Sequence, residues 1–255
     1  MVNAHPRELQ IQFDQRVLMR DDITLSADIY LPLGSLTTKR PVVLERTPYM
    51  KARINFERAK YFVRHGYVFV VMDVRGCGDS DGEFIPYFHE RQDGYDAIEW
   101  CAAQPWSDGN VGTIGASYGG HIQWLAAIER PPHLQAMVVL MPASNPFVEI
   151  PICYQQHLEQ VNVPVLHILG DDEQVETPWD YIDTTALAMH IGSCSQQQIS
   201  IGPWNHTTNV CKQSGKINVG PQALIDLLAE QLYWYDRWLK KLNSSTVILP
   251  ITARE

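Results

Sequence analysis

Apolar positions along the chain follow two different periods, and the switches between them predict the secondary structure. Continuous apolar runs of strand length alternate with segments in which apolar residues recur every three or four positions, the spacing of one helix face. The runs occupy residues 42–46, 67–72, 111–114, 134–141, 163–169 and 198–201. The helical segments occupy residues 56–65, 91–103, 120–130, 178–190 and 221–242. Strands that alternate with helices predict βαβ crossovers, and therefore a mostly parallel sheet with helices on both faces.

Two more strands are expected before this alternating series begins. Residues 11–19 and 23–30 alternate imperfectly around the turn Arg20-Asp21-Asp22, which is typical of an antiparallel hairpin. The total of about eight strands, the 255 residues and the 45% hydrophobic content predict a single α/β domain over residues 1–255. In such sheets ligands bind beyond the carboxyl ends of the strands, so we expect the chemistry in the loops that follow them.

The loop after the run 111–114 carries a candidate nucleophile. Residues 115–120 read Gly-Ala-Ser-Tyr-Gly-Gly and pass directly into the helical segment 120–130. Gly-x-Ser-x-Gly between a strand and a helix is the nucleophile elbow of α/β-hydrolases, in which the glycines let strand and helix approach closely. Ser117 is therefore the predicted nucleophile, and a glycine-rich turn with an incidental serine is the alternative interpretation.

A serine nucleophile needs a base, and the chain offers nine histidines. In α/β-hydrolases the partners follow in the order serine, acid, histidine, and His206 comes directly after the last predicted strand of the sheet. His121 lies close to Ser117 on the same helix and His167 lies within a strand, so we predict structural roles for both. The acid should follow the run 163–169, because it must orient the imidazole. The candidates there are Asp171, Asp172 and Glu173.

The charge that develops on an attacked carbonyl oxygen needs hydrogen-bond donors. The backbone N–H of Tyr118, next to the nucleophile, is one candidate, and the second should come from the loop after the run 42–46. That loop lacks a His-Gly-Gly sequence but contains Tyr49, whose phenol can donate a hydrogen bond. On these residues alone, Tyr49 as a packing aromatic is an equal alternative.

Charge and cysteine content narrow the class of protein. The formal net charge of −9 disfavours nucleic acid and anionic membrane surfaces as partners. The five cysteines form neither an even set nor a Cys-x-x-Cys pair, which argues against a disulfide framework or a zinc site and favours reduced thiols in the cytoplasm. No apolar run reaches the ~18 residues of a membrane span, and no metal or organic cofactor is implied.

Four stretches of the sequence fit together as a family pattern. Residues 46–49 read Arg-Thr-Pro-Tyr, residues 73–82 read Asp-Val-Arg-Gly-Cys-Gly-Asp-Ser-Asp-Gly, residues 93–120 include the nucleophile, and residues 202–206 read Gly-Pro-Trp-Asn-His. Together they resemble the cocaine esterase / X-Pro dipeptidyl-peptidase (S15-like, CocE/NonD) family of serine hydrolases over residues 11–242. The resemblance implies an α/β-hydrolase fold, supports Ser117 and His206, and implies that the Tyr49 hydroxyl is an oxyanion donor.

The sequence departs from this family pattern at the acid. The family's acid loop reads Gly-Trp-Tyr-Asp, whereas Gly170 is followed here by two aspartates and a glutamate. Without a gap the acid would be Glu173, but the later landmarks Thr177 and Tyr181 arrive two residues early, which favours Asp171. We therefore expect Asp171 to complete the triad, with Asp172 and Glu173 as the alternatives.

Two further departures concern segments outside the predicted core. Residues 142–162 stand where the family carries a large helical cap, so we expect a reduced remnant that leaves Ser117 in an open cleft with weak substrate discrimination. Residues 247–251 resemble the start of the family's C-terminal β-sandwich, and an unpaired strand invites pairing with a second chain, which makes a homo-oligomer a hypothesis.

The pattern as a whole predicts a serine hydrolase that cleaves small-molecule carboxylic esters or amides through an acyl-enzyme. An X-Pro dipeptidyl-peptidase is the alternative among enzymes. A hydrolase-fold protein that binds without catalysis is the alternative from another class.

Overall fold

The computed structural model describes most of the chain in separate intervals. The described residues are 9–34, 38–54, 56–141, 161–170, 196–202, 213–214, 217–218 and 225–242. Several segments with predicted roles lie outside these intervals. They are the candidate acids 171–173, the helical segment 178–190, His206, residues 247–251 and all but the last two residues of the cap remnant 142–162.

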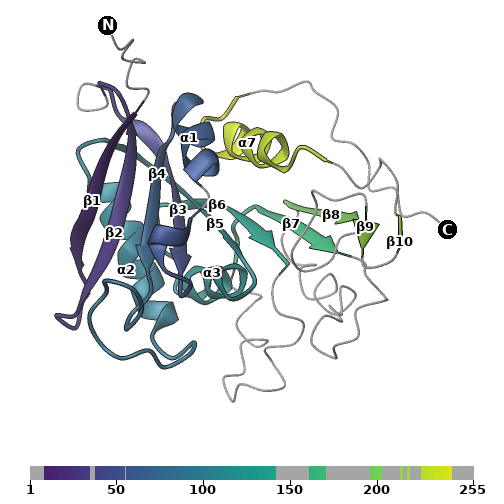
Figure 1. The fold of residues 1–255 in the computed structure, drawn as a ribbon. Coiled ribbons are helices and arrows are strands. Elements are labelled where there is room, and N and C mark those ends of the chain that lie inside the picture. Colours follow the sequence, from purple (N-terminus) through teal and green to yellow (C-terminus); the bar gives the residue numbers. More distant parts are fainter. Residues whose placement is uncertain are drawn as a thin grey trace, which may run out of the picture.

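A single sheet of eight strands organises the described residues (Figure 1). The strands are β1 (Leu9–Leu18), β2 (Thr24–Pro32), β3 (Arg40–Thr47), β4 (Val68–Asp73), β5 (Ser107–Ala116), β6 (Leu134–Leu140), β7 (Val165–Gly170) and β8 (Gln197–Gly202). Their order is β1-β2-β4-β3-β5-β6-β7-β8. The predicted hairpin of β1 and β2 is antiparallel, β2 is also antiparallel to β4, and the remaining pairs are parallel. The mostly parallel sheet predicted from the sequence is therefore confirmed. A short antiparallel pair, β9 (Gln213–Ser214) and β10 (Ile217–Asn218), lies apart from it.

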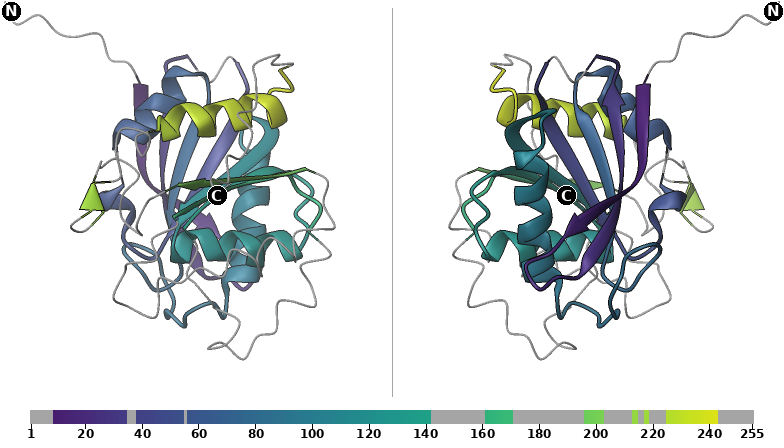
Figure 2. Two further views of the ribbon diagram at one scale, coloured as in Figure 1. Left: turned by 90° about the vertical axis from the view of Figure 1, so that its right-hand side faces the viewer. Right: turned by 90° about the vertical axis from the view of Figure 1, so that its left-hand side faces the viewer.

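Helices cover both faces of the sheet (Figures 1 and 2). The helices α2 (Glu90–Ala103) and α3 (Tyr118–Ile128) pack on one face, and α1 (Phe56–Arg64) and α7 (Leu227–Trp238) pack on the other. Strand β4 is buried along its whole length and sends Val68, Val70 and Met72 into one core and Phe69 and Val71 into the other. A strand that is covered on both faces has apolar residues at every position, which is why the continuous apolar run predicts it.

The last helix is shorter than its apolar spacing predicts. Helical spacing extends over 221–242, but the described helix runs only from Leu227 to Trp238. The Asp226 side chain accepts a hydrogen bond from the Ala229 N–H at 3.0 Å and so caps the helix at this point. Leu242, the last residue of the predicted helical segment, is beyond the helix end and 52% exposed, so that part of the prediction is wrong.

Tyr235 fastens α7 to the strand that leads to the candidate nucleophile. Its hydroxyl donates to the Thr113 carbonyl oxygen at 2.7 Å. A Cβ atom on Gly112 would lie 2.5 Å from the Tyr235 ring, so glycine is what allows this close approach. β5 is therefore held from the face opposite to α3.

Candidate active site

Ser117 occupies the sharp turn between β5 and α3 that the Gly-x-Ser-x-Gly pattern predicted. Its backbone has φ 55° and ψ −123°, a conformation that costs a non-glycine residue free energy and persists only where its surroundings enforce it. The end of β6 supplies that enforcement, because the Ser117 N–H donates to the carbonyl oxygens of Leu140 and Met141 at 3.0 and 3.1 Å. The Ser117 carbonyl oxygen accepts from the His121 N–H at 3.0 Å and begins α3.

The two glycines that flank Ser117 are needed because β5 and α3 nearly touch. A Cβ atom on Gly115 would lie 2.3 Å from the Gly119 carbonyl oxygen, which is closer than non-bonded atoms can come. A Cβ atom on Gly119 would lie 3.1 Å from the carbonyl oxygen of Arg46 in β3. The expectation that glycine permits the close approach of strand and helix is therefore confirmed.

Tyr49 reaches Ser117 from the neighbouring strand. β3 runs parallel to β5 with Glu45 opposite Ile114, so Tyr49 and Ser117 follow their strands at nearly the same height. The Tyr49 hydroxyl lies 3.4 Å from Ser117 Oγ, and the residue is 53% exposed. The structure therefore brings the candidate donor and the candidate nucleophile into direct contact.

A buried lysine fixes the loop that carries Tyr49. Lys51 begins the 3-10 helix η1 (Lys51–Arg53), and its backbone N–H donates to Asp73 Oδ1 at 2.6 Å. Its ammonium lies 3.5 Å from Asp73 Oδ2 and 4.0 Å from Asp28 Oδ1, and it also contacts the Asp79 carboxylate. In the sequence, Asp73 and Asp79 stand out only as part of the stretch 73–82 that carries the family resemblance, and Lys51 does not stand out at all. The available signal was an aspartate at the end of a fully buried strand.

The two histidines predicted to be structural are both buried. Burial lowers the pKa of His121 and of His167 to about 4, so both imidazoles are neutral at neutral pH. His167 Nε2 lies 3.1 Å from Gln197 Oε1, and the ring stacks on Trp124 with 5.6 Å between centroids. The structural role predicted for His167 is confirmed, because the ring is buried in the core and one of its nitrogens has a hydrogen-bond partner.

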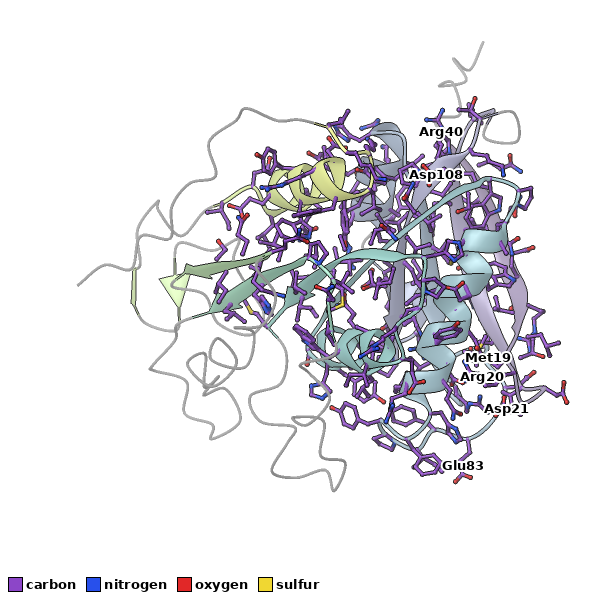
Figure 3. The ribbon with its side chains drawn as sticks, turned by 180° about the vertical axis from the view of Figure 1, so that it is seen from behind. Met19, Arg20, Asp21, Arg40, Glu83 and Asp108 are labelled. Carbon is purple, nitrogen blue, oxygen red and sulfur yellow. The ribbon has the colours of Figure 1, made fainter. Side chains whose placement is uncertain are left out.

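His206 and the candidate acids lie outside the described residues, but the strands that lead to them do not. β7 and β8 are parallel neighbours whose last residues, Gly170 and Gly202, are paired. The chain therefore leaves both strands side by side at the carboxyl end of the sheet. Figure 3 shows Glu83, in the loop after β4, on the opposite side of the molecule from Arg40 and Asp108, which lie near the starts of β3 and β5.

The mostly parallel sheet, its two helical layers and the strained serine turn define an α/β-hydrolase fold. The chain belongs to the X-Pro dipeptidyl-peptidase (S15) family, whose model matches residues 21–153. It is 37% identical over 134 residues to cocaine esterase from Rhodococcus sp. (strain MB1 Bresler), a match that covers 51% of this chain and 23% of that protein. Within the described part of the chain, no helix has both the length and the apolar composition that crossing a membrane requires.

Solved structures share this architecture. A CocE/NonD family hydrolase from Staphylococcus aureus matches with a TM-score of 0.73 at 20% identity, over 93% of this chain and 52% of that one. An esterase from Pyrococcus furiosus matches with a TM-score of 0.69 at 14% identity, over 94% of this chain and 95% of that one. At these identities the likeness establishes the fold.

Proposed function

We propose that the protein is a serine hydrolase that cleaves carboxylic esters through an acyl-enzyme on Ser117. The observation that carries this proposal is the 3.4 Å contact between the Tyr49 hydroxyl and Ser117 Oγ, at the top of a strained strand–turn–helix. A phenol in that place can donate to the carbonyl oxygen of an ester that is bound beside the serine. The similarity to cocaine esterase supports an ester as the substrate.

In the mechanism we propose, His206 takes the Ser117 proton as Oγ attacks the carbonyl carbon, and Asp171 orients the imidazole. The oxyanion accepts hydrogen bonds from the Tyr49 O–H and the Tyr118 N–H. The latter is available because the first N–H groups of a helix have no acceptor within it. His206 then protonates the leaving alcohol, and water releases the acid by the same route. The paired ends of β7 and β8 support these roles, because they direct both loops to the same end of the sheet.

The chain's own groups fill all of these roles, so the proposed reaction uses neither a metal nor an organic cofactor. The substrate we propose is a small-molecule ester or amide.

We also propose a cytoplasmic location, supported by the free thiols of Cys77 and Cys101 among the described residues. The open cleft and the homo-oligomer depend on residues 142–162 and 247–251, so they remain hypotheses, and the mass in solution from light scattering tests the second.

A fluorophosphonate probe tests whether the catalytic site is assembled. We expect it to label the wild-type protein at Ser117, located by peptide mass spectrometry, and to leave Ser117→Ala unlabelled. Thermal unfolding of both proteins serves as the control for folding. A folded wild-type protein that resists labelling would overturn the hydrolase proposal in favour of a non-catalytic binding protein.

An X-Pro dipeptidyl-peptidase is the second candidate, because the family model carries that name. The two activities are separated by kcat/KM on an X-Pro anilide and on a nitrophenyl ester. We expect the ester to be the better substrate, and the reverse order would make the peptidase the function.

A further inference from the structure

A buried carboxylate lies directly behind the nucleophile turn. Glu90 is in the first turn of α2, and its Oε2 accepts from Arg46 Nη2 at 2.6 Å, while its backbone carbonyl accepts from Arg46 Nη1 at 3.2 Å. Its Oε1 accepts from the Tyr118 hydroxyl at 2.9 Å. The exposed fractions of Glu90, Arg46 and Tyr118 are only 4%, 6% and 9%. Charge-assisted hydrogen bonds between buried groups are strong, and they fix the relative positions of their partners.

The two partners of Glu90 belong to the two segments that carry the proposed oxyanion donors. Tyr118 supplies one donor through its own N–H, and Arg46 lies in β3 on the approach to Tyr49, the other donor. The Tyr118 hydroxyl also accepts from the Tyr87 N–H at 2.9 Å. Burial, followed by the charge of Glu90, raises the pKa of Tyr118, so its hydroxyl stays protonated and donates to the carboxylate.

The attachment of α2 to the rest of the protein does not depend on these contacts alone. Asp93 receives two hydrogen bonds from Arg75, at 2.6 and 2.9 Å, and Arg91 Nε donates to Glu129 Oε1 at 2.7 Å. The contacts of Glu90 described above are instead made with the two segments that carry the proposed oxyanion donors.

We propose that Glu90 is a positioning residue. It holds the Tyr118 N–H and the Tyr49 O–H in the positions relative to Ser117 that binding of the oxyanion requires. It does not act as an acid or base, because both carboxylate oxygens already accept hydrogen bonds and the side chain is buried. The inference rests on the proposed hydrolase function. Donors displaced by a fraction of an ångström stabilise the transition state less, while binding of the substrate is little affected.

Two variants test this role. Tyr118→Phe removes only the anchoring hydroxyl and keeps the N–H, and Glu90→Gln removes the charge while keeping the shape of the side chain. We measure kcat per active site titrated with fluorophosphonate, KM, and the affinity for a trifluoromethyl ketone that mimics the oxyanion. We expect kcat and inhibitor affinity to fall together by about tenfold, with KM within about twofold of the wild type.

Glu129→Gln is the matched control, because it breaks the ion pair between Arg91 of α2 and Glu129 at the C-terminal end of α3, which is away from Ser117 and partly exposed. It should retain kcat and inhibitor affinity. The positioning role is overturned if Tyr118→Phe keeps both values, or if the variants lose only melting temperature and the fraction of titratable sites. Should Glu90→Gln fail to fold, Tyr118→Phe decides the question. A wild-type protein that is not labelled at Ser117 would instead overturn the proposed function, and this inference with it.

Discussion

Replacing Tyr49 by phenylalanine removes one hydroxyl from the proposed oxyanion site and leaves its surroundings in place. Tyr49 is 53% exposed. The loop is held by hydrogen bonds from backbone N–H groups to side chains, from Tyr49 N–H to Thr47 Oγ1 at 3.0 Å and from Lys51 N–H to Asp73 Oδ1 at 2.6 Å. We therefore expect the free energy of unfolding to change by less than about 0.5 kcal/mol. A change in rate can then be assigned to the hydroxyl that lies 3.4 Å from Ser117 Oγ.

The expected loss in kcat is about 10²-fold, which corresponds to about 3 kcal/mol of transition-state stabilisation. Loss of one oxyanion donor costs about 10² to 10³ in kcat when the donor acts in a site that excludes water. Tyr49 is half exposed, and water near the hydroxyl weakens its bond to the developing charge, so the lower end of that range applies. The 3.4 Å separation between the Tyr49 hydroxyl and Ser117 Oγ is long for a hydrogen bond, so this contact stabilises the free enzyme little. We therefore expect the KM of Tyr49→Phe to stay within about twofold of the wild-type value.

The assay is steady-state hydrolysis of a nitrophenyl ester, with active sites counted by fluorophosphonate titration. Tyr61→Phe is the matched control, because Tyr61 lies in α1 on the opposite face of the sheet from α3 and should retain kcat. A Tyr49→Phe enzyme whose kcat remains within about threefold of the wild type would refute the donor role and return Tyr49 to the packing alternative.

Packing around the sheet sets three other measurable effects. Gly115→Ala places a methyl group 2.3 Å from the Gly119 carbonyl oxygen. We expect the free energy of unfolding in urea to fall by about 3 kcal/mol and most of the fluorophosphonate labelling of Ser117 to be lost. Labelling equal to that of the wild type would contradict this prediction. Tyr235→Phe leaves the Thr113 carbonyl without its 2.7 Å partner and should cost about 1–3 kcal/mol with kcat unchanged, because α7 lies on the other face. Burial lowers the pKa of His121 and of His167 from 6.5 to about 4, so below pH 6.5 the unfolded chain binds protons that the native state does not. The free energy of unfolding should therefore fall as the pH drops from 6.5 to about 4, by about 3 kcal/mol for each histidine at the lower end of this range. A His121→Asn variant whose free energy of unfolding keeps the wild-type pH dependence would contradict this prediction.

The central strands were predictable because burial on two faces leaves a direct trace in the sequence. The run 67–72 became β4 with a shift of one residue, since nearly every side chain in it is apolar and enters one of the two cores. Helix ends were less predictable, because apolar spacing does not report hydrogen bonds. The capping bond from Asp226 to the Ala229 N–H, and not the spacing over 221–242, decides where α7 begins.

In the candidate site, the positions that sequence could find are those that follow a strand directly. Ser117 comes at once after β5, and Tyr49 comes two residues after β3. That these two meet across 68 residues depends on strand order, since β3 lies between β4 and β5 in the sheet although it precedes β4 in the chain. A local pattern supplies the two loops, but the parallel pairing of β3 with β5 is what sets them beside each other.

Glu90 shows why the electrostatic part of the site could not be predicted in the same way. A glutamate in the first turn of a helix is ordinarily a solvated side chain that complements the helix dipole, and nothing in its neighbours in sequence marks it as different. Its partners are 44 residues earlier, at Arg46, and 28 residues later, at Tyr118, and they meet it only once α2 and α3 pack on the same face of the sheet. The chain places a second carboxylate, Glu129, in that same helix–helix contact, but at the far end of α3 from Ser117. If position relative to the serine turn is what matters, Glu90→Gln and Glu129→Gln must differ in kcat although each removes one negative charge from the same pair of helices.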